Sequence, residues 1–349
     1  MRSKNPSEFE KILLLLQKKP LLSSKEIHDF MDQGSAYATL KRTLQVLLAQ
    51  NLVQTTGKGK STKYSLSSAY ELLRPVDVEA YFQQEIDERI IKMRYNPSLI
   101  VDTLTKALLF TEAEQNHLRQ VHQSHRDNIR QLSANAYALE LERLAIDLSW
   151  KSSQIEGNTY SLLETERLLR EKKTAEGKSK DEATMLLNHK EAIDFIIAHP
   201  TIVEKISVAI IEDLHSILVQ DLGIDRNIRK WKVGISGSNY VPLDNDFQIL
   251  EALEAMVVLI NNESNVISKA LLALVLISYI QPFVDGNKRT ARMISNAILM
   301  HHQYCPLSYR TVDAMEYKKA MLIFYEQNNI SPMKTLFIQQ YEFAVKTYF

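Results

Sequence analysis

The chain has 349 residues, of which 45% are hydrophobic, enough to form two or three domains with cores of their own. Its 42 basic and 42 acidic side chains leave no net charge, which excludes nucleic-acid binding through overall charge and requires a local basic patch instead. The single cysteine, Cys305, excludes an intramolecular disulfide framework and is typical of a reducing cytoplasm. No apolar run is long enough to cross a bilayer, so we expect a cytoplasmic protein with no membrane partner. Nine glycines and nine prolines favour a mainly α fold.

Residues 1–70 are expected to form a separate unit of three helices followed by a hairpin. The expected helices span 8–17, 24–31 and 36–50, the second capped by Ser23 or Ser24 and the third opened by Gly34 and Ser35. Alternating residues at 52–56 and 63–66 predict two strands around a Gly-Lys-Gly-Lys loop. Three helices and a hairpin resemble a winged helix-turn-helix domain, with that loop as its wing.

Basic residues gather in the second half of this unit. Between residues 35 and 63 the chain has no acidic side chain and five basic ones, which are Lys41, Arg42, Lys58, Lys60 and Lys63. They could hold the phosphates of double-stranded DNA through a recognition helix and a basic wing. Such modules also serve as docking or homodimerisation units with a solvated basic face, and the sequence favours neither use over the other.

Residues 71–134 are expected to connect this unit to the rest of the chain. Their patterns predict amphipathic helices at 71–94 and 97–109, followed by a strongly polar helix at 111–131. We therefore expect a helical connector.

Two segments further along the chain have distinctive local patterns. Residues 152–158 read Ser-Ser-Gln-Ile-Glu-Gly-Asn, in which Ser152 and Glu156 share a helix face and Gly157-Asn158 suits a helix C-terminus. Taken alone, this is an ordinary capped helix with a surface glutamate. Residues 231–242 alternate apolar side chains around Gly-Ser-Asn and predict a short β-hairpin within an otherwise helical region.

The most informative segment is 281–292, which reads Gln-Pro-Phe-Val-Asp-Gly-Asn-Lys-Arg-Thr-Ala-Arg. Apolar runs flank it, so the pattern predicts a helix, a sharp loop and a second helix. Free N–H groups of Gly286, Asn287 and Lys288 at the second helix's start can converge on an anion. Arg289 and Arg292 emerge on one side of its first turn, and the carboxylate of Asp285 could hold Mg²⁺ against phosphate oxygens. These residues together predict a polyphosphate site.

The same segment resembles the Fic (Fido-domain) motif His-Pro-Phe-x-Asp/Glu-Gly-Asn-Gly/Lys-Arg-x-x-Arg, with Gln281 at the position of the family's His. The resemblance, which covers about residues 135–349, implies a helical Fic core and a site for ATP and Mg²⁺. The residues it assigns are Gln281, Asn287 and Arg289 for catalysis, Gly286, Asn287, Lys288, Arg289 and Arg292 for ATP, and Asp285 for the metal.

The two other segments also resemble parts of this family. Residues 152–158 resemble the inhibitory motif, whose Glu pairs with the second Arg of the active-site motif and thereby makes ATP bind unproductively. That role falls on Ser152 and Glu156, with Arg292 as the partner. Residues 231–242 resemble the flap, which pins the target side chain beside the nucleotide by strand addition. The flap positions are Gly237, Ser238, Asn239 and Tyr240.

The resemblance implies transfer of AMP from ATP to a hydroxyl group of an unknown target protein, autoinhibited by Glu156. The family's His removes the hydroxyl proton, and Gln281 has no proton-accepting nitrogen near neutral pH. Since a general base contributes about 10²–10⁴ in rate, we expect weakened transfer but retained nucleotide binding. Alternatives are removal of AMP from protein, a catalytically silent nucleotide sensor that regulates transcription through DNA, and a Fic domain that serves only as an oligomerisation body. The sequence does not show whether Lys288, where the family more often has Gly, changes how the nucleotide lies.

Overall fold

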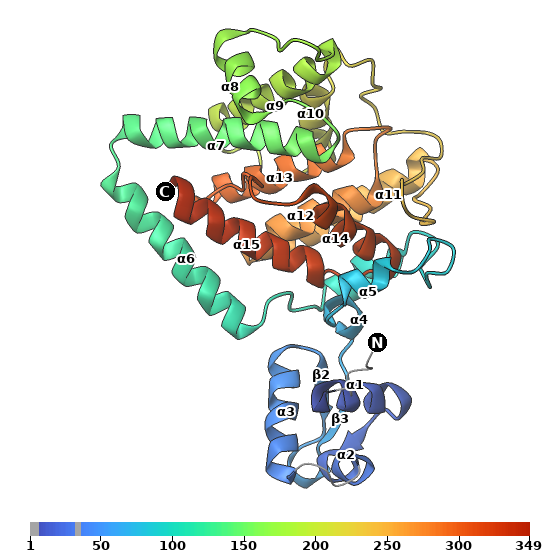
Figure 1. Cartoon of the computed structure of the whole chain (residues 1–349). Helices are drawn as coiled ribbons and strands as arrows, with labels where there is room; N and C mark the ends of the chain where they lie inside the picture. The colour runs from blue at the N-terminus through green and yellow to red at the C-terminus, as the bar shows by residue number, and fades with distance from the viewer. Residues whose placement is uncertain (1–6, 32–35) are drawn as a thin grey trace.

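A computed structural model describes residues 7–31 and 36–349, which form a small N-terminal unit and a large helical body (Figure 1). The expected mainly α class is confirmed, since helices make up most of the body. Among the described residues, no helix is both long and apolar enough to cross a membrane.

The N-terminal unit has the predicted helices and hairpin, with each boundary within two residues of expectation where it is described. Its elements are α1 (Glu8–Lys18), β1 (Leu22–Ser23), α2 (Ser24–Phe30), α3 (Tyr37–Ala49), β2 (Val53–Thr56) and β3 (Lys63–Leu66). Ser23 caps α2 as predicted, whereas the expected helix opening at Gly34 and Ser35 lies outside the described residues. The short β1 was not predicted; it joins the hairpin in an antiparallel sheet of order β1-β3-β2.

A glycine fixes the turn between β2 and β3. Gly57 has a φ of +81°, and a Cβ atom there would lie 2.5 Å from the carbonyl oxygen of Ser61. No other residue fits this turn without moving the backbone. The loop closes through a 3₁₀ turn at Gly59–Ser61, so the basic loop has a defined shape.

The expected long helix at residues 71–94 is wrong. The structure has two short helices instead, α4 (Tyr70–Leu73) and α5 (Val78–Phe82), and an irregular segment from 83 to 96. Pro75 explains the break, because it forces the preceding Arg74 out of the helical region, to a ψ of 143°. A π-helical turn at Leu99–Leu104 replaces most of the helix expected at 97–109, while the polar helix α6 (Glu112–Gln131) is confirmed.

The body consists of nine further helices among the described residues. They are α7 (Ala134–Ile155), α8 (Leu162–Glu171), α9 (Lys180–Ala198), α10 (Val208–Leu218), α11 (Asp246–Asn262), α12 (Val266–Ile280), α13 (Asn287–His301), α14 (Ala314–Gln327) and α15 (Ser331–Tyr348). The antiparallel pair α12 and α13 lies at the centre, with α7, α9 and α10 packed on α13 and with α11, α14 and α15 packed on α12 (Figure 1). Every residue of α12 from 270 to 280 is buried, as expected for a helix that is apolar all round.

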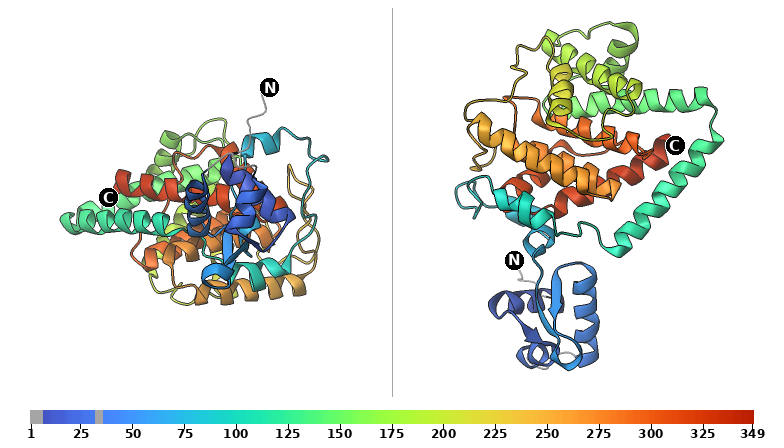
Figure 2. Two further views of the ribbon diagram at one scale, coloured as in Figure 1. Left: turned by 90° about the horizontal axis from the view of Figure 1, so that it is seen from below. Right: turned by 180° about the vertical axis from the view of Figure 1, so that it is seen from behind.

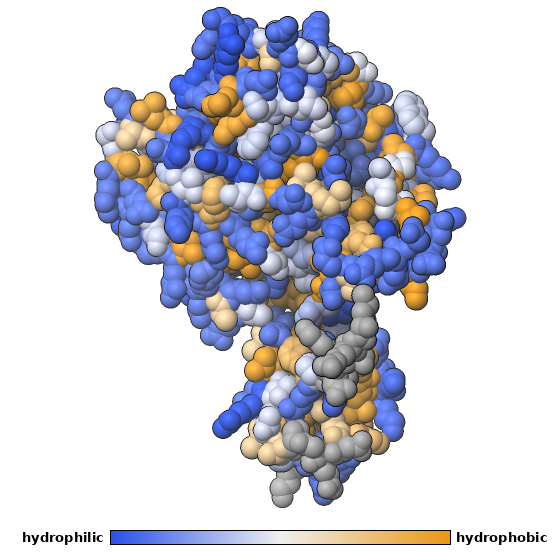
Figure 3. All heavy atoms as spheres, in the orientation of Figure 1, coloured by the Kyte–Doolittle hydropathy of each residue, from blue (hydrophilic) through white to orange (hydrophobic). Residues whose placement is uncertain are grey.

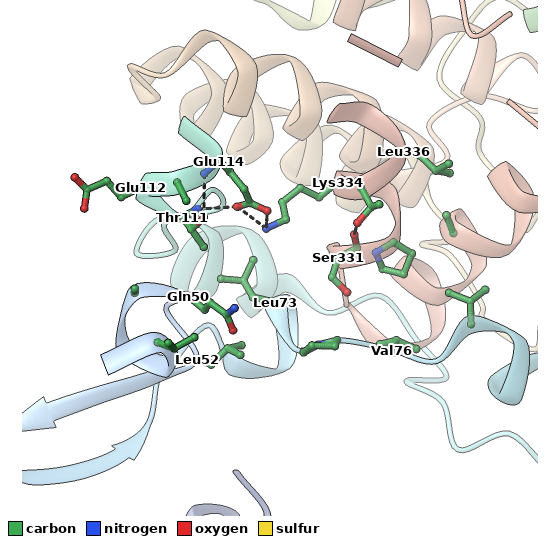
Figure 4. Close-up of a pocket in the computed structure, with 18 of the residues that line it drawn as sticks. Gln50, Leu52, Leu73, Val76, Thr111, Glu112, Glu114, Ser331, Lys334 and Leu336 are labelled. Atoms are coloured by element: carbon green, nitrogen blue, oxygen red, sulfur yellow. Dashed lines mark hydrogen bonds and ion pairs between the residues drawn. The ribbon is translucent and has the colours of Figure 1, made fainter. Parts of the chain in front are cut away.

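The long helix α6 runs along the outer edge of the body and packs against α15 (Figure 2). The space-filling view shows the N-terminal unit as a lobe separated from the body by a narrower waist (Figure 3). A cavity of about 990 Å³ lies at this waist, between Val46 and Ala49 of α3 and the first turn of α6. One wall is fixed by the ion pair of Lys334 with Glu114, 2.9 Å apart (Figure 4).

Candidate active site

Two residues in the left-handed backbone region form the sharp loop between α12 and α13. Gln281 ends α12 with a φ of +53°, and Gly286 precedes α13 with a φ of +81°. A Cβ atom at position 286 would approach the His215 ring to 3.3 Å, so glycine is needed both for its backbone freedom and for the space. The predicted helix, loop and helix therefore stand at the predicted residues.

The side chain of Asn287 holds the loop together from inside. Its amide oxygen accepts a hydrogen bond from the Phe283 backbone N–H (2.9 Å), and its amide nitrogen donates to the Phe283 carbonyl (2.8 Å) and to Gln281 Oε1 (3.0 Å). Asn287 is 4% exposed, so these bonds are protected from water. This side chain therefore shapes the loop from within.

Two residues outside the motif also position the loop. The His215 ring stacks on Phe283 with a centroid distance of 3.6 Å, and its Nε2–H donates to the Asp285 carbonyl at 3.0 Å. Burial lowers the pKa of His215 to about 4, so the ring is neutral at physiological pH. The buried Arg229 donates to the Gln281 carbonyl (2.6 Å) and to the Trp231 carbonyl (2.7 Å), which ties the loop to the start of the flap.

The side chain of Gln281 is engaged at both ends. Its Nε2 donates to the Ser278 carbonyl at 2.6 Å, while its Oε1 accepts from Asn287. One N–H of the amide and its oxygen are therefore engaged, and the amide offers no basic nitrogen.

A cavity of about 550 Å³ opens in front of the loop, which is within the usual range for small-molecule sites. Four elements line it: the active-site loop, the first turn of α13, residues 234–237 of the flap segment and one face of α14. The motif residues that contribute to the lining are Gln281, Asp285, Gly286, Asn287, Lys288 and Arg289, joined by Glu156. The structure thus brings most of the predicted site residues around one cavity.

Asp285 is the one carboxylate of the loop, and its side chain is 65% exposed at the cavity. It lies 3.4 Å from an Arg289 nitrogen. No group of three or more His, Cys, Asp or Glu side chains in the described part of the chain could hold a metal ion by itself. A single carboxylate such as Asp285 could hold Mg²⁺ only together with substrate phosphates.

Arg289 combines burial with a polar contact at the cavity wall. It is 1% exposed and donates to the Leu218 carbonyl at 3.3 Å as well as facing Asp285. Burial lowers the pKa of its guanidinium, which nevertheless stays charged at any physiological pH. The position therefore carries a fixed positive charge beside the only carboxylate of the loop.

Glu156 closes one side of the cavity through two ion pairs. Its Oε1 lies 2.9 Å from an Arg292 nitrogen, and its Oε2 lies 3.1 Å from Lys288 Nζ. Burial favours the neutral acid, but Arg292 and Lys288 outweigh it and lower the pKa of Glu156 to about 2. The predicted partner Arg292 is present. The second partner, Lys288, was not predicted, because a contact between residues 132 positions apart leaves no local sequence pattern.

Arg292 is fully buried and held by several groups. Its Nε donates to Ser152 Oγ (2.7 Å), its NH2 donates to the Ser152 carbonyl (2.9 Å), and its guanidinium lies 5.2 Å from the centre of the Tyr317 ring. Ser152 Oγ is also 2.7 Å from Nε2 of the buried His189, whose pKa burial lowers well below its usual value. Nε2 of a neutral His189 accepts a hydrogen bond from the Ser152 hydroxyl. The hydroxyl oxygen can then accept a hydrogen bond from Arg292. Sequence reasoning missed His189, since a lone histidine in α9 has no distinguishing pattern.

The predicted flap hairpin is wrong in its local structure. No strand is formed between residues 231 and 242, where the structure has an extended segment with a turn at Gly237 and one isolated bridge between Arg94 and Val241. Of the four predicted flap residues, Gly237 lines the cavity. The side chain of Tyr240 turns inward instead, 2% exposed, and stacks on Tyr279 at a centroid distance of 5.0 Å. Ser238 accepts from the Tyr240 N–H, and Asn239 donates to Asp87.

The predicted DNA-binding residues lie in the N-terminal lobe. Lys41, Arg42, Lys58 and Lys63 are exposed, while the side chain of Lys60 lies outside the described part of the structure. The C-terminal end of α3 lines the cavity at the waist, so its N-terminal end, with Lys41 and Arg42, lies away from the body (Figure 1).

Comparisons with known proteins agree with this geometry. Residues 205–299 match the model of the Fic/DOC family. Protein adenylyltransferase Fic of Drosophila yakuba is 28% identical over 218 residues, which cover 60% of this chain and 41% of the relative. The enzyme of the same name from Culex quinquefasciatus is 32% identical over 167 residues, covering 45% and 32%. The chain thus spans less than half the length of these two relatives.

Solved structures show the same fold. C. elegans Fic-1 matches with a TM-score of 0.58 and 23% identity, covering 68% of this chain and 72% of that one. A Fic domain containing signaling protein from Bacteroides thetaiotaomicron matches with a TM-score of 0.54 and 20% identity, covering 66% and 95%. Residues 205–299 are thus similar to the Fic/DOC family, and the chain is similar to proteins named protein adenylyltransferase, which supports the expected Fic-type scaffold.

Proposed function

We propose that the protein binds ATP with Mg²⁺ in the cavity before α13, that Glu156 inhibits it, and that it transfers AMP to a protein hydroxyl at a low rate. The observation that carries this proposal is the double ion pair of Glu156 with Arg292 and Lys288 at the edge of the cavity. Two cations held by one carboxylate at a helix N-terminus form a ready site for phosphate groups.

Different residues around the cavity would bind different parts of ATP·Mg²⁺. Unpaired N–H groups at the start of α13 face the cavity, and Arg289 adds a fixed positive charge beside them. Asp285 is placed to hold Mg²⁺ against phosphate oxygens, and the ion would supply further charge stabilisation during transfer. Arg292 and Lys288 would reach the terminal phosphate only after leaving Glu156.

Inhibition follows from the same contacts. While Glu156 keeps its two ion pairs, its carboxylate faces the region that a terminal phosphate would occupy, and the two negative groups repel each other. ATP can then bind only in a position where its phosphates are held less well. Ser152 supports this state, because it holds Arg292 in the orientation that meets Glu156.

The chemical step is expected to be slow in the natural sequence. A target hydroxyl must lose its proton as it attacks the α-phosphate, and Gln281 supplies no base while both ends of its amide are engaged. The remaining groups only stabilise charge and position the reactants. Without a general base, AMP transfer should be about 10²–10⁴-fold slower than with one.

A thermal-shift titration with ATP and Mg²⁺ tests the binding part of the proposal. Because ATP binds only the folded state, a hundredfold excess over the dissociation constant should add about 2.7 kcal/mol to the free energy of unfolding. The shift should shrink in Asp285→Asn and persist in the matched control Asp102→Asn, an exposed aspartate outside the cavity. The absence of any shift at millimolar ATP would contradict the proposal.

A second candidate function is a silent nucleotide sensor that regulates DNA binding. The engaged amide of Gln281 and the exposed basic residues of the N-terminal lobe favour it. Mass spectrometry of the chain after incubation with ATP separates the two candidates. An added AMP supports transfer, whereas an unmodified protein whose DNA affinity changes with ATP supports the sensor.

A further inference from the structure

The irregular segment of the connector, residues 83–96, lies alongside the flap segment and makes three contacts with it. The Asn239 amide donates to Asp87 Oδ1 at 2.8 Å, Arg89 NH1 donates to the Gly237 carbonyl at 3.1 Å, and the Val241 N–H donates to the Met93 carbonyl at 2.8 Å. The flap residues in these contacts are every second residue. The connector therefore contacts the turn at Gly237 and the segment that follows it.

Arg89 anchors this arrangement to the body. Its side chain is 10% exposed, lies 3.4 Å from the buried carboxylate of Glu326 in α14, and covers the Phe82 ring with 4.7 Å between the guanidinium carbon and the ring centre. The Lys92 N–H donates to the Glu326 carbonyl at 2.7 Å. The preceding residue of α14, Tyr325, lines the cavity, so the connector, the flap turn and the cavity wall meet at this point.

We propose that the connector is part of the acceptor site, with Asp87 and Arg89 as positioning residues that hold the flap in the shape required to receive the target chain. This rests on the proposed function, together with the role that the family resemblance implies for the flap, which is to pin the target side chain beside the nucleotide. The flap has no hairpin pairing of its own, so its shape depends on outside contacts. The connector supplies them at Gly237, Asn239 and Val241, which leaves residues 234–236 of the flap segment, at the cavity, for the target.

The arrangement also links the N-terminal lobe to the site. The connector begins with α4, whose Leu72 carbonyl accepts from the Ile330 N–H at 2.8 Å and whose Glu71 carbonyl accepts from Asn329 at 2.9 Å. These contacts hold the start of the connector on the body, between α14 and α15. Fewer than thirty residues of chain separate these contacts from the flap contacts, so the connector is held on the body at both ends.

Amide hydrogen exchange of the full-length protein tests the proposal without any need to know the target. Asp87→Ala and Arg89→Lys should each raise exchange in residues 234–241 about fivefold, the factor expected for losing one hydrogen bond. Asp87→Asn, whose amide oxygen can still accept from Asn239, should restore protection. Glu88→Ala, an exposed neighbour, is the matched control and should leave exchange unchanged. Equal exchange in all forms would overturn the proposal.

A second measurement separates a positioning role from a structural one. In the Glu156→Gly, Gln281→His background, Asp87→Ala should lower the rate of AMP transfer to the chain itself several-fold, with the KM for ATP and the ATP thermal shift unchanged. Faster transfer would overturn the proposal, because the connector would then block the flap. Loss of the ATP shift in every form, including the background, would instead contradict the proposed function itself.

Discussion

The ion pairs of Glu156 lead to a prediction about stability and pH. Its carboxylate is 18% exposed and contacts both Arg292 and Lys288, which together lower its pKa to about 2. A carboxyl group with a depressed folded-state pKa stabilises the protein above its unfolded pKa of about 4.3 and loses that contribution as pH falls towards 2. A shift of this size corresponds to about 3 kcal/mol at pH 7.

Glu156→Gln should therefore lower the free energy of unfolding by about 3 kcal/mol at pH 7, since it keeps the shape of the side chain but removes its charge. At pH 3.5 part of the wild-type advantage is already lost, so the difference should fall to about 2 kcal/mol. Urea unfolding of both proteins at the two pH values measures this difference, with Glu191→Gln on the exposed face of α9 as control. An unchanged stability at pH 7, or a difference that grows as pH falls, would refute the reasoning.

Three other changes give distinct outcomes. Glu156→Gly and Gln281→His should each raise self-AMPylation little, while the pair raises it by orders of magnitude; robust transfer by the natural protein would show that no base is needed. Asn287→Ala removes three buried hydrogen bonds and should cost about 1–3 kcal/mol of stability and weaken ATP binding, so an unchanged melting temperature would argue against its role in the loop. Replacing Lys58 and Lys63 with Gln should weaken DNA binding and flatten its salt dependence; a lobe that ignores DNA at low salt would favour the docking role.

The sequence predicts the active-site loop well because its chemistry is local. Pro282 and Gly286 break the helical pattern, and apolar runs flank them on both sides. These local features predict a helix, a loop and a helix without any knowledge of the tertiary structure. The N-terminal unit is predictable for the same reason, because helix-capping residues mark its helices and alternating apolar and polar residues mark its strands. The helix expected at residues 71–94 does not form, because Pro75 interrupts it despite the apolar pattern.

Other features depend on contacts between distant segments. The flap alternates like a hairpin, yet its partner is the connector, about 150 residues earlier, rather than its own second half. Lys288 looks like a free phosphate-binding residue in the motif, and only the fold brings Glu156 to it. The amide of Asn287 makes its hydrogen bonds within the loop, which the sequence alone did not indicate. Such pairings leave no periodic pattern for local reasoning to detect.

The most direct test of the whole account is a calorimetric titration of ATP·Mg²⁺ into the natural protein and into Glu156→Gly under the same conditions. Without the carboxylate, Arg292 and Lys288 have no ion pair to give up, and one negative charge less faces the phosphates. The variant should therefore bind ATP more tightly than the natural protein. Equal affinities, or no binding by either, would contradict the claim that Glu156 occupies the phosphate-binding residues of this site.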